Sequence, residues 1–204
     1  MSNHEAPTDS LDLFLRDAGR SPLLTAAQEV KLSKRKGDVI LLREDVIDEV
    51  GPDATRFTYL MQSVDTKLVF DLDVVVQRSM DNPVFYVQMA HARLSSIFRV
   101  AARAPETASP SGVDLAALDE PEELTLMKEL ADFPSLVTGA AAALEPHRVT
   151  GYLEGLARVV HAWYHKYRVL GAPEEAARLV LARAVRQVLA NGLTLMGVGA
   201  PDRM

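Results

Sequence analysis

The stretch NPVFYVQMAHARLSSIFRVAAR, residues 82–103, decides the fold class of this chain. It opens with Asn82 and Pro83, a pair typical of a helix start, because an asparagine side chain accepts hydrogen bonds from free helix amides and proline fits the first turn. One set of side chains then recurs at steps of three and four residues: Val84, Val87, His91, Leu94, Phe98 and Ala101. This spacing predicts a helix with one buried face.

Three later helices are predicted from similar starts at Pro121, Pro146 and Pro173. The last one should stop at Asn191-Gly192, and residues 104–121, rich in Pro, Ser and Gly, should form a flexible loop. The stretch after Pro146 has one apolar stripe, formed by Val149, Leu153, Leu156, Val160, Trp163 and Tyr167. Together these signals predict an all-α helical bundle over residues 83–204.

The first 82 residues also carry helical signals, and we see no convincing pair of strands. SLDLFLRDAG (10–19) and TAAQEVKLSKR (25–35) predict two short helices, which we assign to an N-terminal helical appendage over residues 1–30. LREDVIDEVG (42–51) and PDATRFTYLMQSV (52–64) predict two helices broken at Gly51-Pro52, and DLDVVVQRSMDN (71–82) predicts a third that leads directly into the bundle. Residues 31–82 are therefore interpreted as a connecting segment.

Composition excludes several classes of protein. The 204 residues contain no cysteine, so disulfides, thiol nucleophiles and zinc knuckles are impossible, and we predict neither a metal site nor catalytic residues. No stretch approaches the roughly 20 apolar residues of a membrane span, and the polar start MSNHEAPTDS is unlike a signal peptide. We expect a cytoplasmic protein without a membrane partner.

The net charge of −6 hides an uneven distribution. Residues 104–145 hold nine carboxylates and one lysine, whereas residues 83–103 and 146–204 together hold eleven Lys or Arg and four carboxylates. A basic face can therefore coexist with an acidic whole, and such a face suits a nucleic acid. The alternative is a set of ordinary solvated helix faces.

The segment KLSKRKGD, residues 31–38, is the densest cluster of cations. Four cations in six residues beside a glycine are compatible with a mobile loop that binds polyphosphate, or with the end of a solvated helix. The segment resembles the KMSKS signature of class I aminoacyl-tRNA synthetases, with Leu32 in place of methionine and Arg35 in place of the last serine. The resemblance implies that Lys31 and Lys34 correspond to the two lysines that bind ATP phosphates.

The resemblance continues to the end of the chain. The residues after this signature, GDVILLREDVIDEVGPDATRF, and the blocks FDLDVVVQRSMDNPVFYVQMAHARLSSIFR, EPEELTLMKELADFP, LEPHRVTGYLEGLARVVHAWYHKYRVLG and RQVLANGLTLMGVGAPDRM are similar, in order, to the C-terminal half of arginyl-tRNA synthetases. This resemblance implies a DALR-type anticodon-binding bundle at residues 83–204. It also implies the anticodon arm of tRNA(Arg) as the partner.

The same resemblance implies the tRNA contacts Tyr86, His91, Arg93, Tyr164, Arg168, Arg203 and Met204. Physical reasoning supports part of this set, because aromatic rings stack unpaired bases and cations bind phosphates. Trp163 and Tyr167 lie on the apolar stripe and are expected in the core, and His91 also falls on a buried stripe. Arg178, Arg183 and Arg186 could add phosphate contacts or form a solvated face.

Class I synthetases also need a Rossmann core with a HIGH signature before KMSKS, and neither is found upstream of Lys31. The chain is therefore expected to be inactive alone as an arginine-tRNA ligase. ATP is implied only for the intact family, and no cofactor is expected in this portion.

Residues 8–35, TDSLDLFLRDAGRSPLLTAAQEVKLSKR, resemble the first conserved region of primary bacterial sigma factors. This second resemblance implies an alternative function, a transcription regulator that binds promoter DNA or RNA polymerase. A third possibility is a helical scaffold that binds no nucleic acid.

Overall fold

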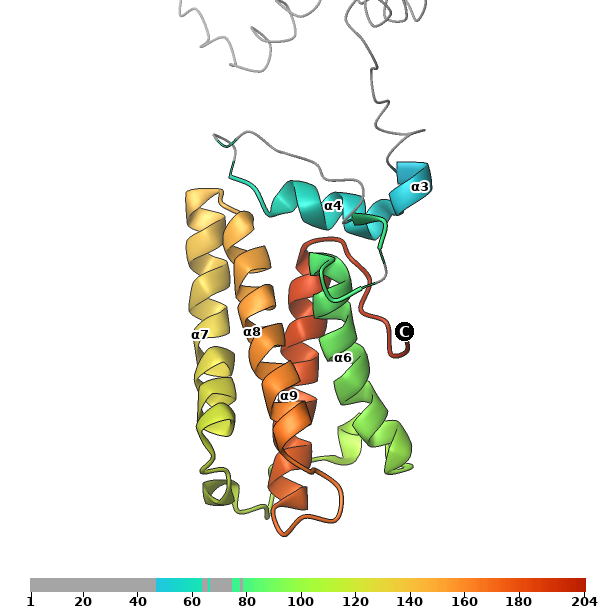
Figure 1. The fold of residues 1–204 in the computed structure, drawn as a ribbon. Coiled ribbons are helices and arrows are strands. Elements are labelled where there is room, and N and C mark those ends of the chain that lie inside the picture. Colours follow the sequence, from blue (N-terminus) through green and yellow to red (C-terminus); the bar gives the residue numbers. More distant parts are fainter. Residues whose placement is uncertain (1–46, 64–65, 67–74, 78) are drawn as a thin grey trace, which may run out of the picture. The chain divides into compact units, whose positions relative to one another are not determined.

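The computed structural model describes residues 47–63, 66, 75–77 and 79–204, and every regular element in these residues is helical. Its α-helices and 3-10 turns are α3 (Asp48–Val50), α4 (Pro52–Leu60), α6 (Pro83–Val100), η2 (Pro105–Thr107), η3 (Leu115–Ala117), α7 (Pro121–Ala143), α8 (His147–Lys166) and α9 (Glu175–Leu195). The four long helices α6 to α9 lie side by side, and α4 crosses one end of them (Figure 1). The predicted all-α bundle is confirmed.

Several predictions fall on residues that the structure does not describe. These are the N-terminal appendage at residues 1–30 and the ATP-binding assignment of Lys31 and Lys34. The predicted domain boundaries stay predictions. None of the helices in the described part of the chain is long and apolar enough to cross a membrane.

The predicted start of α6 is confirmed. The Asn82 side chain accepts a hydrogen bond from the amide of Val84 at 3.2 Å, and Pro83 occupies the first turn. The amide group of Asn82 also donates to the carbonyls of Val75 and Gln77, at 2.8 and 3.0 Å. These bonds hold a turn before α6, so the predicted helix over residues 71–82 is wrong in its described part, where only Val75 is helical.

The helix α7 begins at Pro121, as predicted, with a capping box between Glu120 and Glu123. It continues through Pro134, which has no amide hydrogen for the preceding turn. Residues 104–120 form a loop, as predicted, but the loop packs on the bundle: Leu118 is buried, and Arg183 donates to the carbonyl of Ala108 at 2.9 Å.

The predicted stop of α9 at Asn191-Gly192 is wrong, since the helix continues to Leu195. Gly192 serves packing instead, because a Cβ atom there would lie 2.6 Å from Cδ2 of Leu153 on α8. The helix is terminated by Gly197, whose φ of +66° lets the amide of Val198 donate to the carbonyl of Leu193 at 2.9 Å. This is the usual glycine-ended helix terminus.

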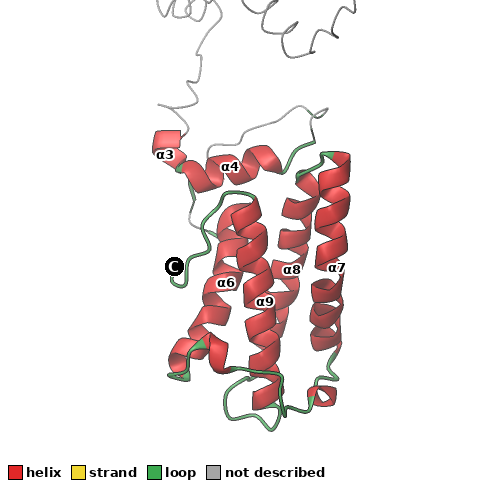
Figure 2. Cartoon of the chain, turned by 180° about the vertical axis from the view of Figure 1, so that it is seen from behind, coloured by secondary structure: helices red, strands yellow, loops and turns green. Residues whose placement is uncertain are grey.

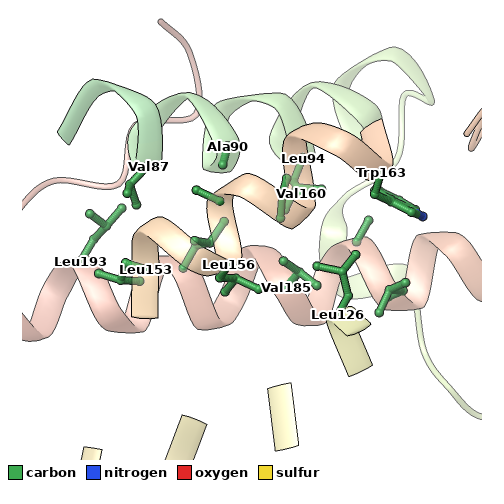
Figure 3. Close-up of a cluster of buried hydrophobic side chains, with 14 of the residues drawn as sticks. Val87, Ala90, Leu94, Leu126, Leu153, Leu156, Val160, Trp163, Val185 and Leu193 are labelled. Carbon is green, nitrogen blue, oxygen red and sulfur yellow. The ribbon is translucent and has the colours of Figure 1, made fainter. Parts of the chain in front are cut away.

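The core is formed by one face of each long helix (Figure 3). Trp163 is fully buried, which confirms its predicted place in the core. The labelled core residues are Val87, Ala90 and Leu94 of α6, Leu126 of α7, Leu153, Leu156, Val160 and Trp163 of α8, and Val185 and Leu193 of α9. Burial of these apolar side chains is the main force that holds the helices together.

A buried ion pair joins three of the helices. Nε of Arg178 on α9 donates to Oε1 of Glu123 on α7 at 2.7 Å, and the indole of Trp163 on α8 donates to the same oxygen at 3.3 Å. Glu123 is 0% exposed and Arg178 is 7% exposed. Arg178 therefore cannot offer its charge to a phosphate, and its assignment to a basic surface is wrong.

Replacing Arg178 by methionine should lower the free energy of unfolding by about 3–5 kcal/mol, because it leaves the Glu123 carboxylate buried without its cation. Urea denaturation followed by Trp163 fluorescence measures this loss. The control is Arg148→Met, which removes an exposed pair with Glu145 and should cost at most about 1 kcal/mol. Equal losses in the two variants would contradict the proposed importance of the buried pair.

Two glycine substitutions should have opposite effects on thermal stability. Gly192→Ala should lower the melting temperature, because Leu153 must move to admit the new methyl group, at a cost of about 1–3 kcal/mol. Gly139→Ala in α7 should raise it, because no atom lies within 4 Å of the added Cβ and alanine favours a helix by about 1 kcal/mol. Calorimetry on both variants tests the packing role of Gly192, and a stabilised Gly192→Ala would refute it.

Candidate nucleic-acid interface

The C-terminal segment, residues 197–204, is fixed against α4 and α6. The amide of Gly199 donates to Oδ2 of Asp53 at 3.0 Å, and the side chain of Gln88 donates to the carbonyl of Gly199 at 2.9 Å. Arg56 of α4 donates to the carbonyl of Gly197. These bonds carry the chain from the end of α9 to the side of α6, as Figure 1 shows.

Asp202 anchors the far part of this segment. Its Oδ1 accepts hydrogen bonds from Ser95 and from Arg186, both at 2.8 Å, and its carbonyl accepts one from Arg99 at 3.1 Å. The bonds from Arg186 and Ser95 hold the pKa of the Asp202 carboxyl below its ordinary value of 3.8. Arg186, considered above as a phosphate contact, is thus already paired inside the protein.

His91 lies beneath the segment and is 1% exposed. Its Nδ1 donates to the carbonyl of Pro201 at 2.9 Å, and its buried Nε2 has no hydrogen-bond partner in the part of the chain that the structure describes. Burial lowers the pKa of His91 below 6.5, so the ring is neutral at pH 7. The structure does not bring His91 to the surface, and its contact with a ligand can only be indirect, through Pro201 and the residues after it.

The anchored segment brings Arg203 and Met204 beside α6. Together with α6 they line a hollow of about 490 Å³, which we call the Arg93 hollow; its residues are Met89, Ala92, Arg93, Ser96, Arg99, Arg203 and Met204. Three of the predicted contact residues therefore meet on one face, since Arg93 lies beside the sequence-distant pair Arg203 and Met204. The hollow offers three guanidinium groups beside two thioethers.

His161 of α8 holds Arg93 in place, although the sequence analysis did not select it. Nη1 of Arg93 donates to Nδ1 of His161 at 2.8 Å, and Nε2 of His161 donates to the carbonyl of Tyr86 at 3.0 Å. Because a guanidinium can only donate, Nδ1 must be unprotonated. Burial lowers the pKa of His161 below 6.5, and the charge of Arg93 lowers it further. The sequence could have indicated His161, because it lies three residues before Tyr164 and therefore on the same side of the helix.

The two candidate stacking residues, Tyr164 and Tyr86, differ in solvent exposure. Tyr164 is 38% exposed, and the guanidinium of Arg93 lies 5.8 Å from the centre of its ring. Tyr86 is partly buried, and its ring packs edge-on against that of His161, with 4.5 Å between the ring centres. Tyr164 therefore has the more open ring for stacking a base.

Arg168 and Tyr167 lie where α8 ends. Arg168 is exposed and shares a hollow of about 250 Å³ with Tyr164 and Ser96. Tyr167, expected in the core, is only partly buried, and its hydroxyl donates to Glu120 and Glu122, at 2.9 and 2.7 Å. Burial raises the pKa of Tyr167 to about 12.

The cations of the described residues are also segregated. Arg103, Arg148 and Lys166 pair with carboxylates. No carboxylate partner is found among the described residues for four arginines around the C-terminal segment and the end of α8, namely Arg93, Arg99, Arg168 and Arg203. This part of the surface is electropositive in a chain of net negative charge.

Comparisons with known proteins identify the family of this chain. Residues 87–204 match the DALR anticodon binding domain, and residues 9–36, outside the described part, match the sigma-70 factor region 1.2. The arginine-tRNA ligase of Geobacter metallireducens is 49% identical over 89% of this chain and 33% of its own length. That of Symbiobacterium thermophilum is 45% identical over 97% of this chain and 36% of its own length.

Solved structures give the same result. A structure described as an arginyl-tRNA synthetase from Campylobacter jejuni has a TM-score of 0.75 and 30% identity, covering 82% of this chain and 36% of that one. The Thermus thermophilus arginyl-tRNA synthetase has a TM-score of 0.63 and 28% identity, and the match covers 98% of this chain and 33% of that one. This chain thus spans about a third of these relatives. The resemblance to their C-terminal part is confirmed, and the chain belongs to the DALR anticodon binding domain family.

Proposed function

We propose that this chain binds the anticodon arm of tRNA(Arg), as the C-terminal tRNA-binding portion of an arginine-tRNA ligase. The observation that carries the proposal is the Arg93 hollow, in which Arg93, Arg203 and Met204 meet beside the exposed ring of Tyr164. An open aromatic ring next to guanidinium groups suits an unpaired base and its phosphates.

Each proposed contact has a physical role. Tyr164 stacks a base of the loop, Arg93 and Arg203 bind phosphate oxygens, and Met204 provides an apolar contact that adapts to the base beside it. Arg168 extends the cationic surface past the end of α8. Tyr86 supports His161 through its carbonyl, and His91 supports Arg203 and Met204 through Pro201.

The names of the relatives suggest a role for the intact protein. We infer that such a protein attaches arginine to tRNA with ATP as a substrate, in the cytoplasm, and that Lys31 and Lys34 would assist with the ATP phosphates there. The sigma-like alternative is not favoured, because the arginine-tRNA ligase match covers 89% of the chain whereas the sigma match is confined to residues 9–36.

Filter binding with arginine tRNA, a non-cognate tRNA and promoter DNA tests the proposal. We expect preference for arginine tRNA and a log–log salt slope of about 0.7 for each phosphate contact to single-stranded RNA. Equal binding to all three nucleic acids, or no binding, would contradict it.

Tyr164→Ala should weaken binding by about 1–3 kcal/mol, the usual value of one base stacked on an aromatic ring. Tyr164→Phe, which keeps the ring, should retain most of the affinity. The same filter assay measures both variants. A loss in Tyr164→Phe as large as in Tyr164→Ala would assign the effect to the hydroxyl and refute the stacking role.

The affinity should fall as the pH is lowered through the pKa of His161, which burial holds below the ordinary value of 6.5, because the ring is neutral above that pKa and protonated below it. Once protonated, Nδ1 can no longer accept the bond from Arg93. His161→Gln cannot titrate, so it should lose this part of the pH dependence. A charge effect alone has the opposite sign, since a cationic ring would strengthen RNA binding. Binding isotherms from pH 7.5 to 5.5 on both proteins decide between them.

A further inference from the structure

A second hollow lies on the other side of the C-terminal segment. It has a volume of about 430 Å³ and is bounded by the last turn of α6, by the η2 turn, by Arg186 of α9 and by Asp202. Neither the sequence analysis nor the proposed anticodon contacts include its main cations, Arg99 and Arg103. We call it the Arg103 hollow.

The local backbone explains how Arg103 reaches this place. Ala102 has a φ of +51°, and the amide of Arg103 donates to the carbonyl of Phe98 at 3.0 Å. This left-handed turn ends α6 and leads the chain into the η2 turn. As a result, Arg99 from the helix and Arg103 from the turn line the same hollow.

The charges in the hollow are unbalanced. Four guanidinium groups, those of Arg99, Arg103, Arg186 and Arg203, face two carboxylates, Glu106 and Asp202. The Asp202 carboxylate is already neutralised by Arg186 at 2.8 Å. Glu106 is then the remaining negative charge of the lining.

Three of the guanidinium groups keep donors for a ligand. Arg99 uses one nitrogen on the carbonyl of Asp202, and Arg203 has no partner among the described residues. Arg103 pairs with Glu175 at 3.2 Å, but its side chain is 55% exposed. An exposed pair of this kind contributes little free energy, so an incoming anion can compete with Glu175.

The two hollows share Arg99 and Arg203. An extended chain of phosphates that leaves the Arg93 hollow therefore meets guanidinium groups without interruption as it passes the C-terminal segment. Guanidinium forks bind phosphate oxygens in pairs, which makes this lining well suited to a phosphodiester.

From this arrangement we propose that the Arg103 hollow is a second phosphate subsite, which binds the RNA backbone next to the nucleotides held at the Arg93 hollow. The inference rests on the proposed function, since both concern the same RNA. Arg103 and Arg99 are the principal donors, and Glu106 limits the affinity of the subsite by its charge.

The test uses the full chain and an RNA hairpin with the anticodon stem and loop of arginine tRNA. Arg103→Gln should weaken binding several-fold at low salt and should reduce the log–log salt slope by about 0.7. The control is Arg148→Gln, which removes an arginine of similar exposure, 51%, at the opposite end of the bundle, and should leave both values unchanged.

A gain of affinity provides a second measurement that damaged folding cannot imitate. Glu106→Gln removes the negative charge from the hollow and should tighten binding by about two-fold, roughly the effect of one screened surface charge. Asp132→Asn, which removes an exposed carboxylate from α7, should have no effect. Ethylation interference should lose the signal of one phosphate in Arg103→Gln while the other signals remain.

The outcomes separate the inference from the function on which it rests. The second subsite alone is overturned if the unaltered chain binds the RNA but Arg103→Gln has the same affinity and salt slope as Arg148→Gln. In that case the ethylation pattern is also unchanged. Absence of binding by the unaltered chain overturns the proposed function and the subsite with it. A weakened Arg103→Gln together with a tightened Glu106→Gln supports the subsite.

Discussion

The buried pair of Glu123 and Arg178 constrains how the helices of the bundle can pack. An isolated charge in an apolar core is so unfavourable that α7 and α9 must bring these groups together, and the Trp163 indole fixes α8 against the same carboxylate. Arg178 also donates to the carbonyl of Arg168 at 3.0 Å. The constraint that sets the helix packing therefore also sets the path of the chain where it leaves α8, beside the candidate interface.

Features that depend on neighbouring residues in the sequence could be predicted from the sequence alone. Prolines and caps predicted the starts of α6 and α7, and the apolar spacing predicted the burial of Trp163. The role of a residue could not be predicted where that role depends on a contact with another helix. Gly192 reads as a helix stop, yet its role comes from Leu153 of another helix. From the sequence, Arg178 was predicted to be a surface cation, because its partner Glu123 lies 55 positions earlier and no neighbouring residue indicates the pairing.

The candidate site shows the same division. Residue type and family resemblance selected Arg93, Tyr164, Arg203 and Met204, but the packing of α8 on α6 places Tyr164 beside Arg93, and the return of the C-terminal segment brings Arg203 and Met204 there. His161 and Arg99 were missed because their importance lies in partners from other parts of the chain. His161 is defined by its bonds to Arg93 and to the carbonyl of Tyr86, and Arg99 by its bond to Asp202.

The left-handed Gly197 has a consequence for the thermodynamics of recognition. By reversing the chain after α9, it brings Gly199, Pro201 and Asp202 to their partners: the Gly199 amide donates to Asp53, while the carbonyls of Gly199 and Pro201 and the carboxylate of Asp202 accept hydrogen bonds from Gln88, His91, Ser95 and Arg186. Ordering a free tail on binding would cost about 1–2 kcal/mol per residue in backbone entropy. Here that cost is met during folding for the hydrogen-bonded residues of the segment, so the proposed RNA partner would meet a preorganised surface.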